Sequence, residues 1–161
     1  MGRDDVFIEP IDGSNWRKTL DVHAAAEQRR FVTDYEPVAL VILAKAFVRA
    51  GERTWHPLAI RVQDKIVGVA ALAQANKRCT LYHFLIDRDH QGQGIGKAAI
   101  GLIIAYVRQS WPTCTTLLLT VHPDNGAART LYGSVGFEPT GEVINDEPVF
   151  ELFLDQPRPP D

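Results

Sequence analysis

Three glycines at alternate positions, Gly92, Gly94 and Gly96, lie between a run of strand-forming residues and a run with helical periodicity. Glycine lets the backbone approach a ligand closely, because it has no Cβ. The first N–H groups of a helix have no partner within the helix, and the helix dipole favours negative charge there. Because Lys97 follows directly, the segment predicts a site for an anion such as a phosphate.

Three phosphate-binding patterns compete for this turn. A dinucleotide fingerprint, G-x-G-x-x-G, fails because Lys97 stands three residues after Gly94. A P-loop, G-x-x-x-x-G-K-[ST], that ended on Gly96 and Lys97 would need Gly at Gln91 and Ser or Thr at Ala98. The pattern Q-x-x-G-x-G is met by Gln91, Gly94 and Gly96. A plain strand–helix loop is the alternative, because glycines also serve simple turns.

A second group of residues follows the next strand-forming run. Asn125 stands where a helix is expected to begin, Arg129 lies one turn further on, and Tyr132 follows Leu131. A helical tyrosine beside a leucine is usually a core aromatic, and arginine is common on exposed helix surfaces. These residues acquire a chemical interpretation only together with the glycine turn.

Short elements must position both groups. Strands are predicted over 6–11, 58–63, 66–74, 80–87, 115–121, 137–142 and 149–154, with 58–63 and 66–74 joined as a hairpin. Helices are predicted over 14–20, 24–32, 37–49, from the glycine turn to Pro112, and over 125–135. Helices first, then a hairpin-rich sheet, then two strand–helix crossovers predict a mixed α/β sheet.

Composition restricts the class of protein. The 161 residues, 45% hydrophobic and 23% charged, fit one domain over 1–161, with 155–161 as a frayed tail. A net charge of −3 gives no basic footprint for nucleic acid. Cys79 and Cys114 are interpreted as buried free thiols, and no spacing indicates a metal site. The chain shows neither a signal core nor the ~20 apolar residues of a membrane span, so a cytoplasmic protein is expected.

Together the two groups resemble the GNAT superfamily of N-acetyltransferases. One signature runs from Ile86 to Gly96, and the other runs from Val121 to Tyr132 and closes with Gly136-Phe137. The N-terminal half is similar to bacterial diamine and spermine/spermidine acetyltransferases. The resemblance implies an α/β (α+β) fold with a GNAT-like mixed, mostly antiparallel central sheet of about six to seven strands. Helices would cover both faces, with acetyl-CoA at a splayed strand pair.

The resemblance also implies where acetyl-CoA would bind. Backbone N–H groups of the glycine turn would hold its pyrophosphate, and its pantetheine arm would pair with the strand edge before the turn. Asn125 would hydrogen-bond that arm, and Arg129 is either a further contact or a solvated helix charge. The residues so assigned are Leu85, Ile86, Asp87, Gln91, Gly92, Gln93, Gly94, Ile95, Gly96, Lys97, Asn125 and Arg129.

Acetyl transfer to an amine needs two proton movements. An alkylammonium with a pKa near ~10 must lose its proton before it attacks, and the departing thiolate must be stabilised or protonated. The resemblance implies Tyr132 as the general acid, since a phenol can donate a proton to sulfur. His83 is a candidate base because histidine titrates near pH ~6.5. A water chain that ends on an acidic residue is the competing arrangement, and a structural role is the alternative for His83.

The expected acceptor is a small-molecule primary amine, a polyamine or a diamine, which attacks directly in a ternary complex. Glu27, Asp34 and Glu36 would attract this cation at the entrance, and a solvated helix surface is the alternative for each of them. A protein lysine or N-terminal acetyltransferase and a non-catalytic acyl-CoA-binding module remain as alternatives. The resemblance implies a homodimer, with no metal, nucleic acid or membrane partner.

Overall fold

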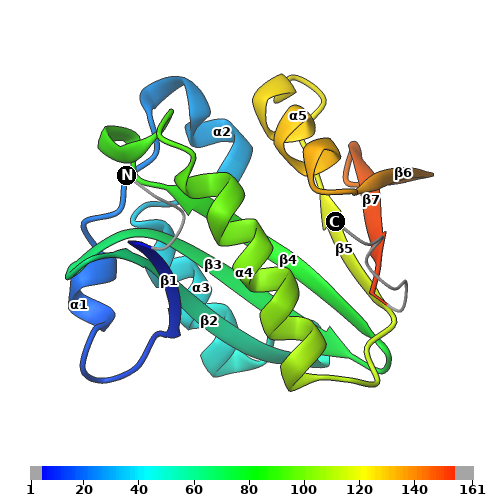
Figure 1. The fold of residues 1–161 in the computed structure, drawn as a ribbon, viewed down its shortest axis with the longest axis horizontal. Helices are drawn as coiled ribbons and strands as arrows, with labels where there is room; N and C mark the ends of the chain where they lie inside the picture. The colour runs from blue at the N-terminus through cyan, green and yellow to red at the C-terminus, as the bar shows by residue number, and fades with distance from the viewer. Residues whose placement is uncertain (1–4, 155–161) are drawn as a thin grey trace.

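The structure, a computed structural model, describes residues 5–154, so the tail expected at 155–161 lies outside the described residues. One sheet of seven strands carries helices on both sides (Figure 1). The strands are β1 Val6–Pro10, β2 Thr54–Val62, β3 Lys65–Ala75, β4 Arg78–Ile86, β5 Thr116–Thr120, β6 Glu138–Ile144 and β7 Glu147–Phe153. The helices are α1 Trp16–Thr19, α2 Arg29–Val32, α3 Val38–Val48, α4 Ile95–Ser110 and α5 Gly126–Ser134, with 3₁₀ turns η2 Ala26–Gln28, η3 Ala50–Glu52 and η4 Arg88–His90.

The strand order is β1-β2-β3-β4-β5-β7-β6, and every neighbouring pair is antiparallel except β4 and β5. β4 and β5 run parallel because α4 returns the chain across the sheet between them. α5 makes a second crossover, from β5 past β7 to the edge strand β6. The expected mixed, mostly antiparallel sheet with late strand–helix crossovers is confirmed.

Helices α4 and α3 cover opposite faces of the sheet (Figure 1). Strand β3 serves both faces because successive side chains of a strand point to opposite sides. Ala70 and Leu72 therefore pack in the cluster with α4, whereas Val69 and Ala71 pack in the cluster with α3. Cys79 is buried on the α4 side. With both faces covered, the central strands form a fixed frame for the loops that follow them.

The segment before β2 is more broken than the sequence predicts. The single helix expected over 24–32 is the 3₁₀ turn η2 followed by the one-turn helix α2. No residue of either piece is buried, so tertiary packing adds little to hold a longer helix. The helix expected over 37–49 is confirmed as α3. Among the described residues, no helix is both long enough and apolar enough to cross a membrane.

Candidate active site

Strands β4 and β5 separate part-way along their length. They pair only where residues 78–80 face residues 116–118, and β4 then continues beside β3 as far as Ile86. A cavity of about 130 Å³, called the wedge below, lies between the separated strands. Its walls come from α2, β4, β5, α5 and the loop between β5 and α5. The splayed strand pair expected from the sequence is present.

A β-bulge in β4 shapes one wall of the wedge. His83 and Phe84 together face the single residue Ala70 of β3, because the register there advances by three residues on β4 for two on β3. His83 has a φ of 53°, a left-handed conformation that is uncommon for residues other than glycine. Bulges re-aim side chains next to functional sites, and His83 lines both the wedge and a cleft beside it.

The glycine turn leads into the N-terminus of α4, as predicted. Gly92 and Gly94 have φ values of 75° and 79°, which side chains with a Cβ rarely adopt. Gly94 occupies the N-cap position without a side-chain cap, so the N–H groups of the first helical turn are open to a ligand. A cavity of about 260 Å³, called the turn cavity below, adjoins the turn, and neither Asp nor Glu lines it. This surface suits an anion.

The predicted cofactor-binding residues divide into two groups at the turn cavity. One group lines it: Leu85, Ile86, Gln91, Gly92, Ile95, Gly96 and Asn125. The other group lies outside its lining: Asp87, Gln93, Gly94, Lys97 and Arg129. All of this second group except Asp87 are exposed, and Arg129 donates a hydrogen bond to the Pro123 carbonyl at 3.3 Å.

Asp87 holds the local structure at the end of β4. Its carboxylate accepts hydrogen bonds from the N–H groups of His23 at 2.8 Å and Asp89 at 3.2 Å, and it lies 3.3 Å from Nδ1 of His90. Burial raises the pKa of Asp87, but the hydrogen bonds outweigh burial and hold that pKa below its usual value. A charged Asp87 thus ties the strand end to the N-terminal segment just before the glycine turn.

Gln91, the first residue of the Q-x-x-G-x-G pattern, makes two side-chain hydrogen bonds. Its Nε2 donates to the Ile86 carbonyl at 2.9 Å and to Oε1 of Gln28 at 2.7 Å. A side-chain amide has two N–H donors, so one residue can bind the end of β4 and the turn η2 together. The glycine turn is therefore held in place by a side chain on its own first residue.

Asn125, at the start of α5, both caps the helix and lines two of the cavities. Its Oδ1 accepts the Ala128 N–H at 3.2 Å and so caps the helix. The side-chain NH₂ is not needed for this cap, and Asn125 lines both the turn cavity and the wedge. The amide can therefore donate to a carbonyl of a molecule that lies across the two spaces.

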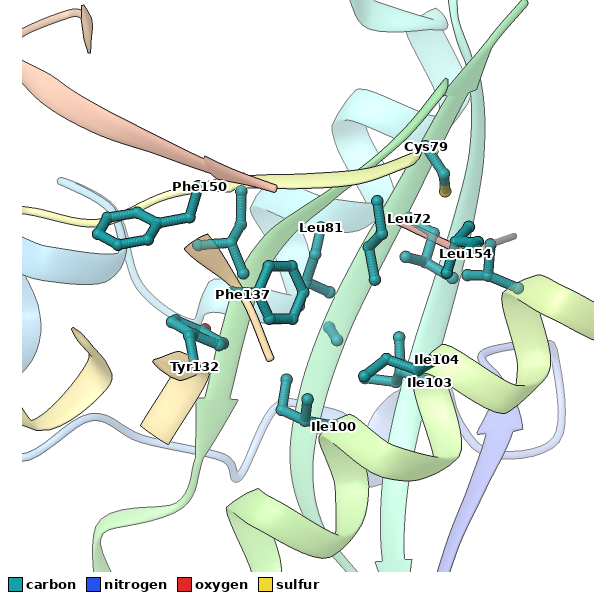
Figure 2. Packing of buried hydrophobic residues seen from close by; sticks show 14 of the residues in the cluster. Leu72, Cys79, Leu81, Ile100, Ile103, Ile104, Tyr132, Phe137, Phe150 and Leu154 are labelled. Atoms are coloured by element: carbon teal, nitrogen blue, oxygen red, sulfur yellow. The ribbon is translucent and has the colours of Figure 1, made fainter. Parts of the chain in front are cut away.

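Tyr132 lies on α5 at the edge of the α4-side core, beside Phe137 (Figure 2). Its ring meets those of Phe84 and Phe137 edge-on, at centroid distances of 6.4 and 5.7 Å. Burial raises the pKa of its hydroxyl, so the phenol stays protonated at neutral pH. Because Tyr132 also lines the wedge, it brings a proton donor to the space between the two strands.

His83 is held between a carbonyl and an amine. Its Nδ1 lies 3.0 Å from the Val32 carbonyl oxygen, and its Nε2 lies 2.8 Å from Nζ of Lys45. A carbonyl only accepts and an ammonium only donates, so Nδ1 carries the proton and Nε2 presents its lone pair to Lys45. Burial and the Lys45 charge lower the pKa of His83 to about 4. A base role for this neutral histidine therefore requires Lys45 to release the Nε2 lone pair.

A larger space of about 580 Å³, called the hairpin cleft below, adjoins the wedge. It runs from His83 along β4 and β5 to the β3–β4 and β6–β7 hairpins. Phe31 and Val32 of α2 line the turn cavity, the wedge and the hairpin cleft alike. The three spaces therefore adjoin one another at α2, with His83 in the lining of the wedge and the hairpin cleft and Tyr132 in the lining of the wedge.

The acids predicted to bind the acceptor lie elsewhere. Glu27, Asp34 and Glu36 are exposed and line none of these three cavities, and Glu36 pairs with Arg29 at 3.4 Å. The charged residues that line the hairpin cleft are Arg53, Arg78 and Glu147. Sequence reasoning missed these three and Lys45. Only Lys45 gave a signal, as the single charged residue in the apolar run that forms α3.

Residues 18–137 match the model of the acetyltransferase (GNAT) family. The chain belongs to this family. The family resemblance and the enzyme class expected from the sequence, an N-acetyltransferase, are thus confirmed. Among the residues that the structure describes, no group of three or more His, Cys, Asp or Glu is placed to hold a metal ion.

Named relatives of this GNAT chain differ in how much of it they match. It is 24% identical over 153 residues to the probable spermine N(1)-acetyltransferase of Bacillus subtilis subsp. natto, over 89% of the chain and 95% of that protein. It is 29% identical over 86 residues to human N-acetyltransferase 8B, a match that covers 50% of this chain and only 37% of the human protein. The spermidine N-acetyltransferase of Vibrio cholerae, solved with CoA and spermine, shares its fold with a TM-score of 0.71 and 14% identity over 94% of this chain and 96% of that one.

Proposed function

We propose that the protein transfers an acetyl group from acetyl-CoA to a primary amine of a small molecule, by direct attack in a ternary complex. The observation that carries this proposal is the meeting of the turn cavity and the hairpin cleft at one wedge. A donor in the turn cavity and an acceptor in the hairpin cleft would meet between β4 and β5. Tyr132, on the wall of the wedge, is the proton donor at that point.

The residues around the turn cavity fit the donor. The left-handed glycines and the open helix N-terminus suit the pyrophosphate. The strand edge at Leu85 and Ile86 and the amide of Asn125 suit the pantetheine arm, and all three residues line the cavity. When bound, acetyl-CoA supplies an acyl group activated as a thioester. Asp87, Gln93, Lys97 and Arg129 are proposed as outer contacts or supports of the same site.

The chemistry needs one new bond and one broken bond. The amine nitrogen bonds to the thioester carbonyl carbon, the carbon–sulfur bond breaks, and Tyr132 donates its proton to the departing sulfur. The amine gives up a proton to His83 when Lys45 releases the Nε2 lone pair, or to water. A phenol is protonated at neutral pH and burial raises the pKa of Tyr132 further, so the donor carries its proton before the reaction begins.

Which amine accepts the acetyl group is the more specific part of the proposal. The name of the Bacillus relative favours a polyamine or diamine. Charges in the hairpin cleft favour a different amine. A homodimer and a cytoplasmic location also belong to the proposal, and light scattering on the purified protein tests the first of these.

Free-thiol release tests the proposed function. Purified protein is mixed with acetyl-CoA and with polyamines, diamines, amino acids, an acetyl-accepting peptide or no amine. We expect thiol release above the amine-free rate with a small amine, and mass spectrometry should show that amine acetylated. Release with the peptide alone would support the protein acetyltransferase instead. Tight acetyl-CoA binding without turnover on any amine would leave the non-catalytic binding module.

A further inference from the structure

The hairpin cleft carries more positive than negative charge. Arg53 and Arg78 are the cationic residues that line it, and Glu147 is the one acid in that lining. Lys45 adds a third positive group beside His83, 2.8 Å from its Nε2. Among residues 5–154, no carboxylate forms an ion pair with Arg53, Arg78 or Lys45. The cleft therefore presents positive charge that the described part of the protein leaves unbalanced.

Arg53 is held in position for an anionic group. Its Nη1 donates to the Tyr82 hydroxyl, and its guanidinium carbon lies 5.4 Å from the centroid of the Tyr82 ring. That ring lies 6.2 Å from the ring of His83, so Tyr82 stands between Arg53 and the histidine that lines the wedge. A guanidinium has five N–H donors in one plane and binds a carboxylate through two of them at once. The donors of Arg53 that Tyr82 does not use are thus preorganised for a carboxylate.

Glu147 lies on the opposite side of the splayed strands. Its carboxylate accepts a hydrogen bond from Oγ1 of Thr120 at 2.7 Å. In the sheet order, β7 with Glu147 follows β5, whereas β2, which begins just after Arg53, precedes β4 by two strands. The cleft therefore has an acidic side and a basic side with the wedge between them. A molecule with an ammonium at one end and a carboxylate at the other is complementary to this arrangement.

A polyamine fits the same arrangement poorly. It carries an ammonium group at both ends, and the second one would meet the basic side of the cleft. Arg53 and Arg78, which line the cleft, would both repel that second ammonium group. The acids expected to attract a polycation, Glu27, Asp34 and Glu36, do not line the cleft.

We propose that the hairpin cleft selects an amine that also carries a carboxylate, an amino acid in the broad sense, as the acceptor of the transferase reaction proposed above. Arg53 binds the carboxylate, and the amine lies on the Glu147 side with access to the wedge. Arg53 is thus a residue that determines specificity. It does not take part in acetyl transfer itself.

A matched pair of acceptors tests this proposal. Cadaverine and ε-aminocaproate have the same five-carbon amine chain and differ in the far group, an ammonium in one and a carboxylate in the other. Thiol release gives kcat/KM for each. We expect kcat/KM to be about 10- to 100-fold higher for ε-aminocaproate, the range that a charge-assisted bidentate contact supplies.

Variants of Arg53 decide whether the cleft sets this preference. Arg53→Gln should remove it, Arg53→Glu should reverse it in favour of cadaverine, and Arg53→Lys should keep its direction, mainly through changes in KM. Arg17→Gln, at an exposed position of helix α1 outside the hairpin cleft, should leave the preference unchanged. Thermal melting and acetyl-CoA affinity of each variant show that its fold and donor site are intact.

The outcomes separate the two proposals. If cadaverine is the equal or better acceptor in the wild type, or if folded Arg53→Glu keeps the wild-type preference, the amino-acid proposal is wrong and the transferase function stands. If neither these two acceptors nor any other amine releases thiol, the transferase function is wrong and the acceptor proposal falls with it.

Discussion

The turn cavity and the hairpin cleft are neighbours that depend on the sequence in different ways. Eight of the fifteen residues that line the turn cavity lie close together in the chain, from Phe84 to Gly96, and the others come from residues 28–32 and 125–131. The hairpin cleft draws Arg53, His83, Thr120 and Glu147 from separate elements. A donor site can thus be encoded as a short motif, whereas the acceptor site depends on how the whole sheet is assembled. One family can therefore keep one donor and vary the acceptor.

The largest expected effect lies where the two spaces meet. Tyr132→Phe removes the proposed proton donor and keeps the ring that packs against Phe84 and Phe137. We expect kcat to fall by ~10²–10⁴-fold, the contribution of a well-placed general acid, with acetyl-CoA affinity unchanged. Steady-state thiol release and equilibrium binding measure the two quantities.

A matched control for this variant is Tyr106→Phe, since Tyr106 lies on α4 and lines none of the three cavities. It should keep wild-type kcat. Full activity of Tyr132→Phe would show that the hydroxyl is not the acid and that another group protonates the sulfur.

The next largest effect is a change of protein stability with pH that depends on His83, in the lining of the hairpin cleft. The folded-state pKa of His83, about 4, lies below the ordinary 6.5. As the pH falls, the unfolded chain therefore binds this proton first, so the His83 contribution to stability is present above pH 6.5 and is lost towards pH 4. A pKa difference of this size corresponds to about 3 kcal/mol.

His83→Asn tests this pH dependence, because asparagine tolerates the left-handed φ at this position better than most residues do. Urea unfolding at several pH values should show a shallower loss of stability in this variant between pH 6.5 and 4 than in the wild type. Equal slopes would mean that His83 titrates normally in the folded protein. Lys45→Met sharpens the test, since loss of the neighbouring charge should raise the pKa of His83 in an NMR titration.

The sequence also predicted the turn cavity, proposed for the donor, better than the hairpin cleft, proposed for the acceptor. The glycine turn, the helix that begins near Asn125 and the splayed strand pair were expected because they depend on local spacing and a family resemblance. The His83 bulge was not expected, since it arises from the register between β3 and β4. The Lys45–His83 contact joins residues 38 apart through the packing of α3, and no short pattern records it. Glu27, Asp34 and Glu36 were assigned to the acceptor by charge alone; they lie outside the lining of the three cavities, and their role in binding stays a prediction.

On the turn side we expect an effect on donor affinity. Gly94→Val places a β-branched residue at a φ of 79°, and such backbone strain costs ~1–3 kcal/mol. If the turn distorts to relieve it, acetyl-CoA affinity falls by about 10-fold or more, with little change in relative preference among amines. Isothermal titration with acetyl-CoA measures the affinity.

Gly101→Ala is the control, because Gly101 lines none of the three cavities. Gly101 lies within α4, is exposed, and would place a Cβ with nothing within 4 Å. This change should leave acetyl-CoA affinity unchanged and raise stability by roughly 0.5–1 kcal/mol. Wild-type affinity in Gly94→Val would show that the turn does not hold the donor in the proposed way.

The smallest effect concerns the contact between α2 and the loop before α5. Arg30 Nη1 and Asp124 Oδ2 are 3.0 Å apart, but both side chains are about 60% exposed (60% and 61%). Water and salt screen such a pair, so Arg30→Gln should lower the free energy of unfolding by less than ~1 kcal/mol. A double-mutant cycle with Asp124→Asn, run at low and high salt, measures the coupling. A coupling above this limit that survives high salt would mean that α2 is locked over the wedge by the pair itself. A coupling within this limit would mean that the pair adds little to the position of α2 over the wedge.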